Sequence, residues 1–140
     1  MDVNEKRSLI LDNYQNPINK GLPDDNSYVK VNSKNESCVD NITVAAKIKD
    51  DKLDDIKFDG EACAICSSAT NVMTKELKGK SLDEAEVIVD NFKRMINELP
   101  YDEEKLGELN IYNEVYKQPS RKRCALLPME AISKIIDDEE

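Results

Sequence analysis

The spacing of hydrophobic and polar residues changes twice along this chain. Near the N-terminus, residues 4–14 place the apolar run Leu9-Ile10-Leu11 among charged residues, which predicts a short helix. Pro17 and Pro23 follow it, and proline cannot continue the hydrogen-bond ladder of a helix. We therefore expect a helix and then a loop that reaches about residue 26.

Between residues 28 and 60 the spacing approaches two, the period of a strand with one buried face. Three such runs follow one another, and Asp50-Asp51 separates the last two. Their apolar members are Tyr28, Val29 and Val31, then Ile42, Val44, Ala46 and Ile48, then Ile56 and Phe58. The pattern predicts three antiparallel strands. The polar segment 33–36 places Cys38 and Asp40 on a loop or at a strand end.

After Gly60 the spacing is that of helices. One helix is predicted over 64–78, and the capping box Ser81-Leu82-Asp83-Glu84 starts a second. A short helix is expected within 108–116. Ser120 is expected to cap the last helix, which Pro128 should kink or divide. The acidic residues 137–140 are expected to form a solvated tail.

This order of elements predicts an α+β fold, in which helices pack on one face of a three-stranded antiparallel sheet. The length of 140 residues predicts a single domain over 1–140. No apolar run reaches the roughly 18 residues of a membrane span, and the N-terminal sequence has no signal-peptide pattern. A cytoplasmic protein without a membrane partner is the expectation.

The formal net charge of −9 argues against nucleic acid as a partner, because phosphate neutralisation needs a basic face. The one dense cationic run, Arg121-Lys122-Arg123, directly precedes Cys124. These cations, with the N-terminal dipole of the last helix, are placed to stabilise Cys124 as a thiolate. The other interpretation is a solvated helix start.

The residue types narrow the possible chemistry further. The chain has four cysteines and no histidine, so imidazole ligands and histidine-dependent nucleophile schemes cannot be built from it. Four cysteines in a reducing compartment are more often metal ligands or reactive thiols than disulfides. A metal would therefore have to bind sulfur and oxygen.

Three separated positions offer such ligands where the chain is expected to turn. They are Cys38-Val39-Asp40, Cys63 and Cys124, whose cysteines lie 25 and 61 residues apart. This spacing is far from that of a zinc knuckle, so a site would be assembled by the fold from different elements. For Asp40 the alternative is a turn-forming residue at a strand start.

Cys66 completes the sequence Cys63-Ala64-Ile65-Cys66, which admits a redox or zinc-knuckle interpretation. On a helix, however, Cys66 would point about 300° round from Cys63. A structural role for Cys66 is therefore favoured.

Several motifs, in order and separation, resemble the iron–sulfur scaffold superfamily of IscU, SufU and NifU-like proteins. They are Asn16-Pro17-Ile18-Asn19-Lys20-Gly21, Cys38-Val39-Asp40, Phe58-Asp59-Gly60-Glu61-Ala62-Cys63-Ala64-Ile65, Met73-Thr74, Lys78-Gly79-Lys80 and Arg123-Cys124-Ala125. The long stretch from Gly79 to Cys124, and Arg123 where IscU proteins have histidine, resemble the SufU branch. The IscU Leu-Pro-Pro-Val-Lys motif is absent.

The resemblance implies a SufE/IscU-like fold and zinc bound by Cys38, Asp40, Cys63 and Cys124, with iron or a [2Fe–2S] cluster as a transient alternative. It also implies a SufS-type pyridoxal-phosphate cysteine desulfurase as partner, with downstream iron–sulfur assembly machinery. By this resemblance Cys38 is the expected sulfur acceptor, and Cys124 is the second choice.

Three functions stay open at this point. The first is a zinc-dependent, sulfurtransferase-like acceptor of persulfide sulfur, and the second is a scaffold on which a [2Fe–2S] cluster is built. The third is a non-catalytic interaction domain that zinc only stabilises. The long Gly79–Cys124 stretch and the missing histidine favour the first.

Overall fold

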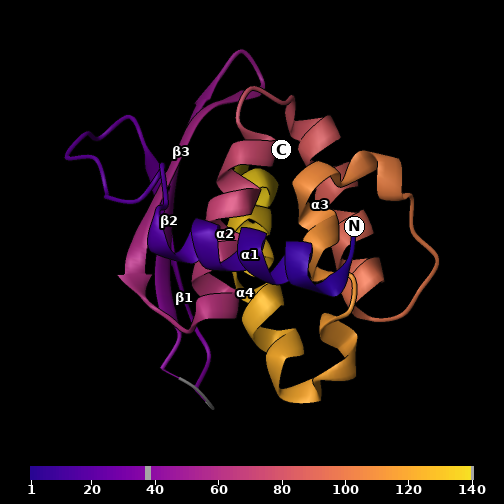
Figure 1. The fold of residues 1–140 in the computed structure, drawn as a ribbon. Coiled ribbons are helices and arrows are strands. Elements are labelled where there is room, and N and C mark those ends of the chain that lie inside the picture. The colour runs from indigo at the N-terminus through magenta and orange to yellow at the C-terminus, as the bar shows by residue number, and fades with distance from the viewer. Residues whose placement is uncertain (37–38, 140) are drawn as a thin grey trace.

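The computed structural model describes residues 1–36 and 39–139 (Figure 1). Four α-helices and three strands form its framework, with three short 3₁₀ helices between α3 and α4. In chain order the elements are α1 Val3–Gln15, β1 Val29–Lys34, β2 Asn41–Lys49, β3 Lys52–Glu61, α2 Ala64–Leu77, α3 Leu82–Ile96, η1 Glu103–Lys105, η2 Gly107–Tyr112, η3 Val115–Lys117 and α4 Pro119–Glu139.

The sheet has the order β1-β2-β3, and both strand pairs are antiparallel, as the alternating pattern predicted. Asp50 and Asp51 form the tight turn between β2 and β3 with φ of 53° and 59°. Aspartate tolerates this left-handed conformation better than most residues, which explains the Asp-Asp pair at the turn. A register shift lies beside this turn, between Lys47 and Ile48.

The helices lie on one face of the sheet, with α2 and α4 against it and α1 across α2 (Figure 1). The buried core between the layers includes Ile42, Val44 and Ile56 from the sheet and Val72 and Ile132 from the helices. This confirms the predicted α+β class. Within the described ranges, no helix is both long and apolar enough to cross a membrane.

The last helix differs from its prediction at its start. It begins at Pro119 rather than after a Ser120 cap, because proline is well suited to the first helical position, where no N–H bond is lost. Pro128 does not divide it, and α4 is assigned as one helix. Proline has no N–H, so the carbonyl of Cys124 lacks its usual donor four residues on.

One further difference concerns the segment between α3 and α4. The short helix expected within 108–116 is instead the pair η2 and η3. The acidic end is helical through Glu139, and Asp137 and Asp138 are exposed in its last turns.

A polar cluster ties the loop before β1 to β3 and α2. The Tyr28 hydroxyl donates to Asp55 Oδ2 at 2.5 Å, and Lys78 Nζ lies 3.2 Å from Asp55 Oδ1. The hydrogen bond to Asp55 raises the pKa of Tyr28 to about 12. Burial raises the pKa of Asp55, but the bonds from Tyr28 and Lys78 outweigh it, so that this pKa is lowered.

We expect Tyr28→Phe to reduce the free energy of unfolding at neutral pH by about 1–2 kcal/mol, because it removes a hydrogen bond to a carboxylate. The folded-state pKa of Tyr28 lies above its ordinary value of 10.0. Its contribution is therefore complete below about pH 10 and is lost as the pH rises toward about 12. Urea unfolding of both proteins across this range should show the gap closing, and a constant gap would contradict the assignment.

Candidate metal centre

The start of β2 and the end of β3 bring the first two predicted ligands together. Asn41 pairs with Glu61 in the antiparallel register, so Asp40 and Cys63 extend from neighbouring strand ends. The Asp40 side chain is bound to the backbone beyond β3, where Oδ1 accepts from the Cys63 N–H at 2.8 Å. Asp40 Oδ2 lies 3.8 Å from Cys63 Sγ.

Gly60 allows the strands to approach at this junction. It pairs with Ile42 and has φ of 137°, a conformation that L side chains rarely adopt. A Cβ added here would collide with the carbonyl oxygen of Asn41 and lie 2.9 Å from Ile42 Cα. The close approach of the two strands therefore requires glycine at position 60, three residues before Cys63.

We expect Gly60→Ala to destabilise the fold by about 3 kcal/mol or more, because backbone strain and a backbone clash add together. Gly79→Ala is the matched control, since Gly79 has φ of 84° but open space where a Cβ would be added. Thermal melting of both variants separates the two contributions. Equal losses would show that the close approach to Asn41 carries no cost of its own.

Cys63 occupies the N-cap of α2, with φ of −64° and ψ of 167°. Its Sγ accepts from the Cys66 N–H at 3.4 Å, so the thiol faces the positive end of the helix dipole. The sequence predicts this N-cap position, because the expected helix over 64–78 begins directly after Cys63.

Cys124 approaches from α4, which packs against β1, β2 and α2. Its side chain is buried, with a relative exposure of 1%. The Sγ donates to the Ser120 carbonyl at 3.7 Å and accepts from Asn35 Nδ2 at 3.9 Å.

Asn35 is a polar residue of this site that sequence reasoning missed. It is buried at 3% exposure, and its N–H donates to the Asp40 carbonyl at 2.9 Å. Asn35 therefore contacts both the Asp40 backbone and the Cys124 thiol. The short polar segment 33–36 predicted a loop but gave no sign that this side chain turns inward.

Among the described residues, the structure brings together Asp40, Cys63 and Cys124, whose ligand atoms all lie within 4.8 Å of one another. Ligand atoms around a tetrahedral zinc ion lie about 3.5–3.8 Å apart, given zinc–ligand bonds of about 2.0–2.3 Å. A slight contraction would let this set hold such an ion. Cys38, the remaining predicted ligand and expected acceptor, lies outside the described residues.

The electrostatics of Cys124 differ from the sequence-based hypothesis. Burial raises the pKa of its thiol, and the neighbouring Asp40 and Cys63 raise it further. Lys122 pairs with Glu98 at 3.9 Å and Arg123 with Glu130 at 3.7 Å. Without a metal the thiol is therefore favoured over the thiolate, and a bound cation would reverse this preference.

Cys66 is fully buried in the hydrophobic core and is not part of the metal-ligand group. Burial raises the pKa of its thiol well above the ordinary value. Cys63, Cys66 and Cys124 are all free thiols. These observations agree with the structural role favoured for Cys66.

The chain also resembles known proteins over nearly its whole length. The sequence model of the NifU-like N-terminal domain matches residues 5–136. The zinc-dependent sulfurtransferase SufU of Bacillus subtilis is 36% identical over 135 residues, which cover 96% of this chain and 90% of the relative. The iron–sulfur cluster assembly scaffold protein IscU of Streptococcus pyogenes serotype M1 is 33% identical over 131 residues, covering 92% and 80%.

Solved structures agree with these sequence relatives. The crystal structure of a protein from Fervidobacterium islandicum AW-1, described as an iron–sulfur cluster assembly scaffold for the SUF system, superposes with a TM-score of 0.82. It is 31% identical, and the match covers 89% of this chain and 91% of that one. The chain therefore belongs to the NifU-like N-terminal domain family, within the SufU and IscU group of iron–sulfur cluster assembly proteins.

Proposed function

We propose that this protein binds zinc through Cys38, Asp40, Cys63 and Cys124 and accepts persulfide sulfur from a pyridoxal-phosphate cysteine desulfurase. The observation that carries the proposal is the convergence of Asp40, Cys63 and Cys124 from three separate elements. The name of the Bacillus subtilis relative, a zinc-dependent sulfurtransferase, supports it. The sulfur would then pass to downstream iron–sulfur assembly machinery.

The donor set suits zinc. Three thiolates and one carboxylate match the preference of zinc for sulfur with a hard fourth ligand, and the complex carries a formal charge of about −2. Bound zinc would keep these thiols deprotonated at neutral pH. Asp40 orients its carboxylate through the 2.8 Å bond from the Cys63 N–H.

Sulfur transfer needs no external oxidant or reductant. The Cys38 thiolate would attack the terminal sulfur of the desulfurase persulfide, forming a new sulfur–sulfur bond. The sulfur–sulfur bond of the desulfurase breaks, and its cysteine leaves as a thiolate. Cys38 is then the persulfide, and the desulfurase is ready for another cysteine.

The two other ligand cysteines, Cys63 and Cys124, are less suited to this attack. Cys63 is held at the α2 N-cap and through its backbone bond to Asp40. Cys124, the second choice, is only 1% exposed, so a partner's persulfide could not reach it without displacing its neighbours. These constraints support Cys38 as the acceptor. Asp40, Cys63 and Cys124 would then retain the metal, and the partner could supply a ligand at the position that Cys38 vacates.

We expect the protein purified without chelator to contain about one zinc ion per chain, because a site of three thiolates binds zinc tightly at neutral pH. Inductively coupled plasma mass spectrometry of the gel-filtered protein measures this ratio. Lys49→Glu, on the exposed β2 end, is a control that should keep the same zinc content. Less than about a tenth of an equivalent in the wild type would contradict the zinc proposal.

The function is tested with a cysteine desulfurase and ³⁵S-labelled cysteine. We expect the zinc-loaded protein to gain label that dithiothreitol releases and to raise the rate of alanine formation, and the zinc-stripped protein to do neither. The alternative is a [2Fe–2S] scaffold, the role named for the IscU relative. A cluster absorbance after iron and sulfide addition, with no dithiothreitol-releasable label, would favour that alternative.

A further inference from the structure

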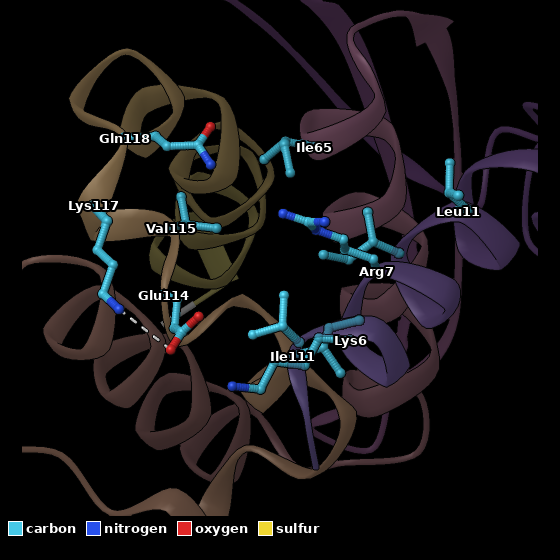
Figure 2. A pocket seen from close by; sticks show the side chains of 11 residues that line it. Lys6, Arg7, Leu11, Ile65, Ile111, Glu114, Val115, Lys117 and Gln118 are labelled. Carbon is cyan, nitrogen blue, oxygen red and sulfur yellow. Dashed lines mark hydrogen bonds and ion pairs between the residues drawn. The ribbon is translucent and has the colours of Figure 1, made fainter.

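A groove lies between α1, the first turn of α2 and the segment η2–η3 (Figure 2). It encloses about 430 Å³, within the size range of protein binding sites of about 300–1,000 Å³. Its apolar lining includes Ile10 and Leu11 of α1, Ile65 of α2, and Ile111 and Val115 of the η segment. Leu11 remains 50% exposed.

The charged residues that line this groove are mostly positive, although the whole chain is negatively charged. The protein carries a formal charge of −9, yet the groove is lined by Lys6, Arg7 and Lys117 against the single acid Glu114. Figure 2 shows the Arg7 guanidinium directed into the groove, toward Ile65 and Val115. Within 1–36 and 39–139, neither Lys6 nor Arg7 forms an ion pair.

The cations stand on opposite walls, because Lys6 and Arg7 belong to α1 and Lys117 to η3. Lys117 pairs with Glu114 at 3.4 Å, but both side chains are about half exposed. Such a surface pair contributes at most about 1 kcal/mol and can be exchanged for another carboxylate. Each wall therefore offers positive charge above an apolar floor.

The walls are held in place by a polar network behind them. Asn13 of α1 donates to Glu108 Oε2 at 2.7 Å and accepts from Asn71 of α2 at 2.8 Å. Lys75 of α2 lies 2.8 Å from Glu108 Oε1. This network joins α1, α2 and η2, so the groove is formed before any partner binds, and preorganisation reduces the entropy cost of binding.

We propose that this groove binds an acidic amphipathic helix of a partner protein. Leucine-like side chains at helical spacing would fill the apolar floor, while carboxylates on both flanks would meet Arg7, Lys6 and Lys117. Ile65 is two residues from Cys63, so the partner would be held beside the metal centre. The proposal needs neither zinc nor sulfur transfer and goes beyond the function proposed above.

The test uses a fluorescein-labelled helical peptide of about four turns, with leucine at i, i+3, i+4 and i+7 and glutamate on its flanks. A second peptide has lysine in place of glutamate. Fluorescence anisotropy with the full-length protein should give at least about tenfold tighter binding for the acidic peptide. In methyl NMR, the signals of Ile65 and Ile111 should shift, while that of Ile56 in the sheet core should not.

Arg7→Glu should weaken binding of the acidic peptide at least about tenfold, whereas the same charge change in Lys49→Glu should alter it less than about twofold. Both residues are exposed, so melting temperatures should stay close to the wild type. Equal affinity for the two peptides, an unaffected Arg7→Glu protein or shifts remote from the groove would overturn the proposal. Two other results would also overturn it. If decanoate shifted the groove methyl signals and the acidic peptide did not, the groove would bind a small amphipathic acid. If raising the protein concentration alone shifted them, the groove would bind a second copy of this chain.

Discussion

Replacing Cys63 by serine is expected to abolish zinc binding and to lower the free energy of unfolding of the zinc-loaded protein by about 4 kcal/mol. A ligand present at about 1,000 times its dissociation constant stabilises the folded state by this amount. Serine is a good N-cap, so the start of α2 should be preserved when the thiol that accepts from Cys66 N–H is lost. The zinc-free forms of wild type and Cys63→Ser should therefore melt within a few degrees of each other.

Comparing Asp40→Ala with Cys63→Ser tests whether the carboxylate and the thiolate have different roles in zinc binding. It leaves three thiolates to hold zinc, so we expect the metal to remain bound but to exchange with a chelator at least about tenfold faster. The structure adds a second effect, because the substitution also removes the acceptor of the Cys63 N–H. That loss costs about 1–3 kcal/mol whether zinc is present or not.

Asp40→Asn separates these effects, since its carbonyl can still accept from Cys63 N–H. Zinc release to a colorimetric chelator, measured beside urea unfolding, follows both quantities for each variant. Equal zinc loss and equal destabilisation in Cys63→Ser and Asp40→Asn would contradict the different roles assigned to thiolate and carboxylate.

Cys38→Ser is expected to reduce sulfur acceptance, expressed per bound zinc ion, by about a hundredfold or more. A serine hydroxyl is not ionised at neutral pH and cannot replace a thiolate as the attacking group. Cys66→Ala is the matched control, because it also removes one thiol but from the buried core. Dithiothreitol-releasable ³⁵S on each protein, after incubation with desulfurase and labelled cysteine, measures acceptance.

Full acceptance by Cys38→Ser would remove Cys38 from the proposed role. A large loss in Cys66→Ala, with its fold and zinc content intact, would instead transfer that role to the core thiol. The expected order is therefore wild type and Cys66→Ala together, far above Cys38→Ser.

Much of the fold could be predicted because the spacing of apolar residues follows the period of a strand in one part of the sequence and the period of a helix in the rest. Alternation from Tyr28 to Phe58 predicted the strands, and the Ser81 capping box predicted the start of α3, where Ser81 Oγ accepts from Glu84 N–H at 3.1 Å. The start of α4 was misplaced because Ser120 is a common cap while Pro119 fits the first turn better. The region 107–117 carries a weaker signal, and its 3₁₀ turns depend on contacts with α2, as in the bond between Tyr112 and Ser68.

The candidate site was less accessible to sequence reasoning, because its geometry depends on strand register. The sequence motifs indicated Asp40, Cys63 and Cys124 as ligands. Only the pairing of Asn41 with Glu61 explains why Asp40 and Cys63 lie close together. The cations before Cys124 were expected to act on its thiol, yet helix geometry directs Lys122 and Arg123 to Glu98 and Glu130.

The most direct test of the sulfur-acceptor account is to locate the transferred sulfur. The zinc-loaded wild type is incubated with desulfurase and cysteine, free thiols are alkylated, and peptides are mapped by mass spectrometry. The account predicts a mass increase of about 32 Da, one sulfur atom, on the peptide that contains Cys38. An adduct confined to Cys63, Cys66 or Cys124, or no adduct while the desulfurase turns over, would contradict it.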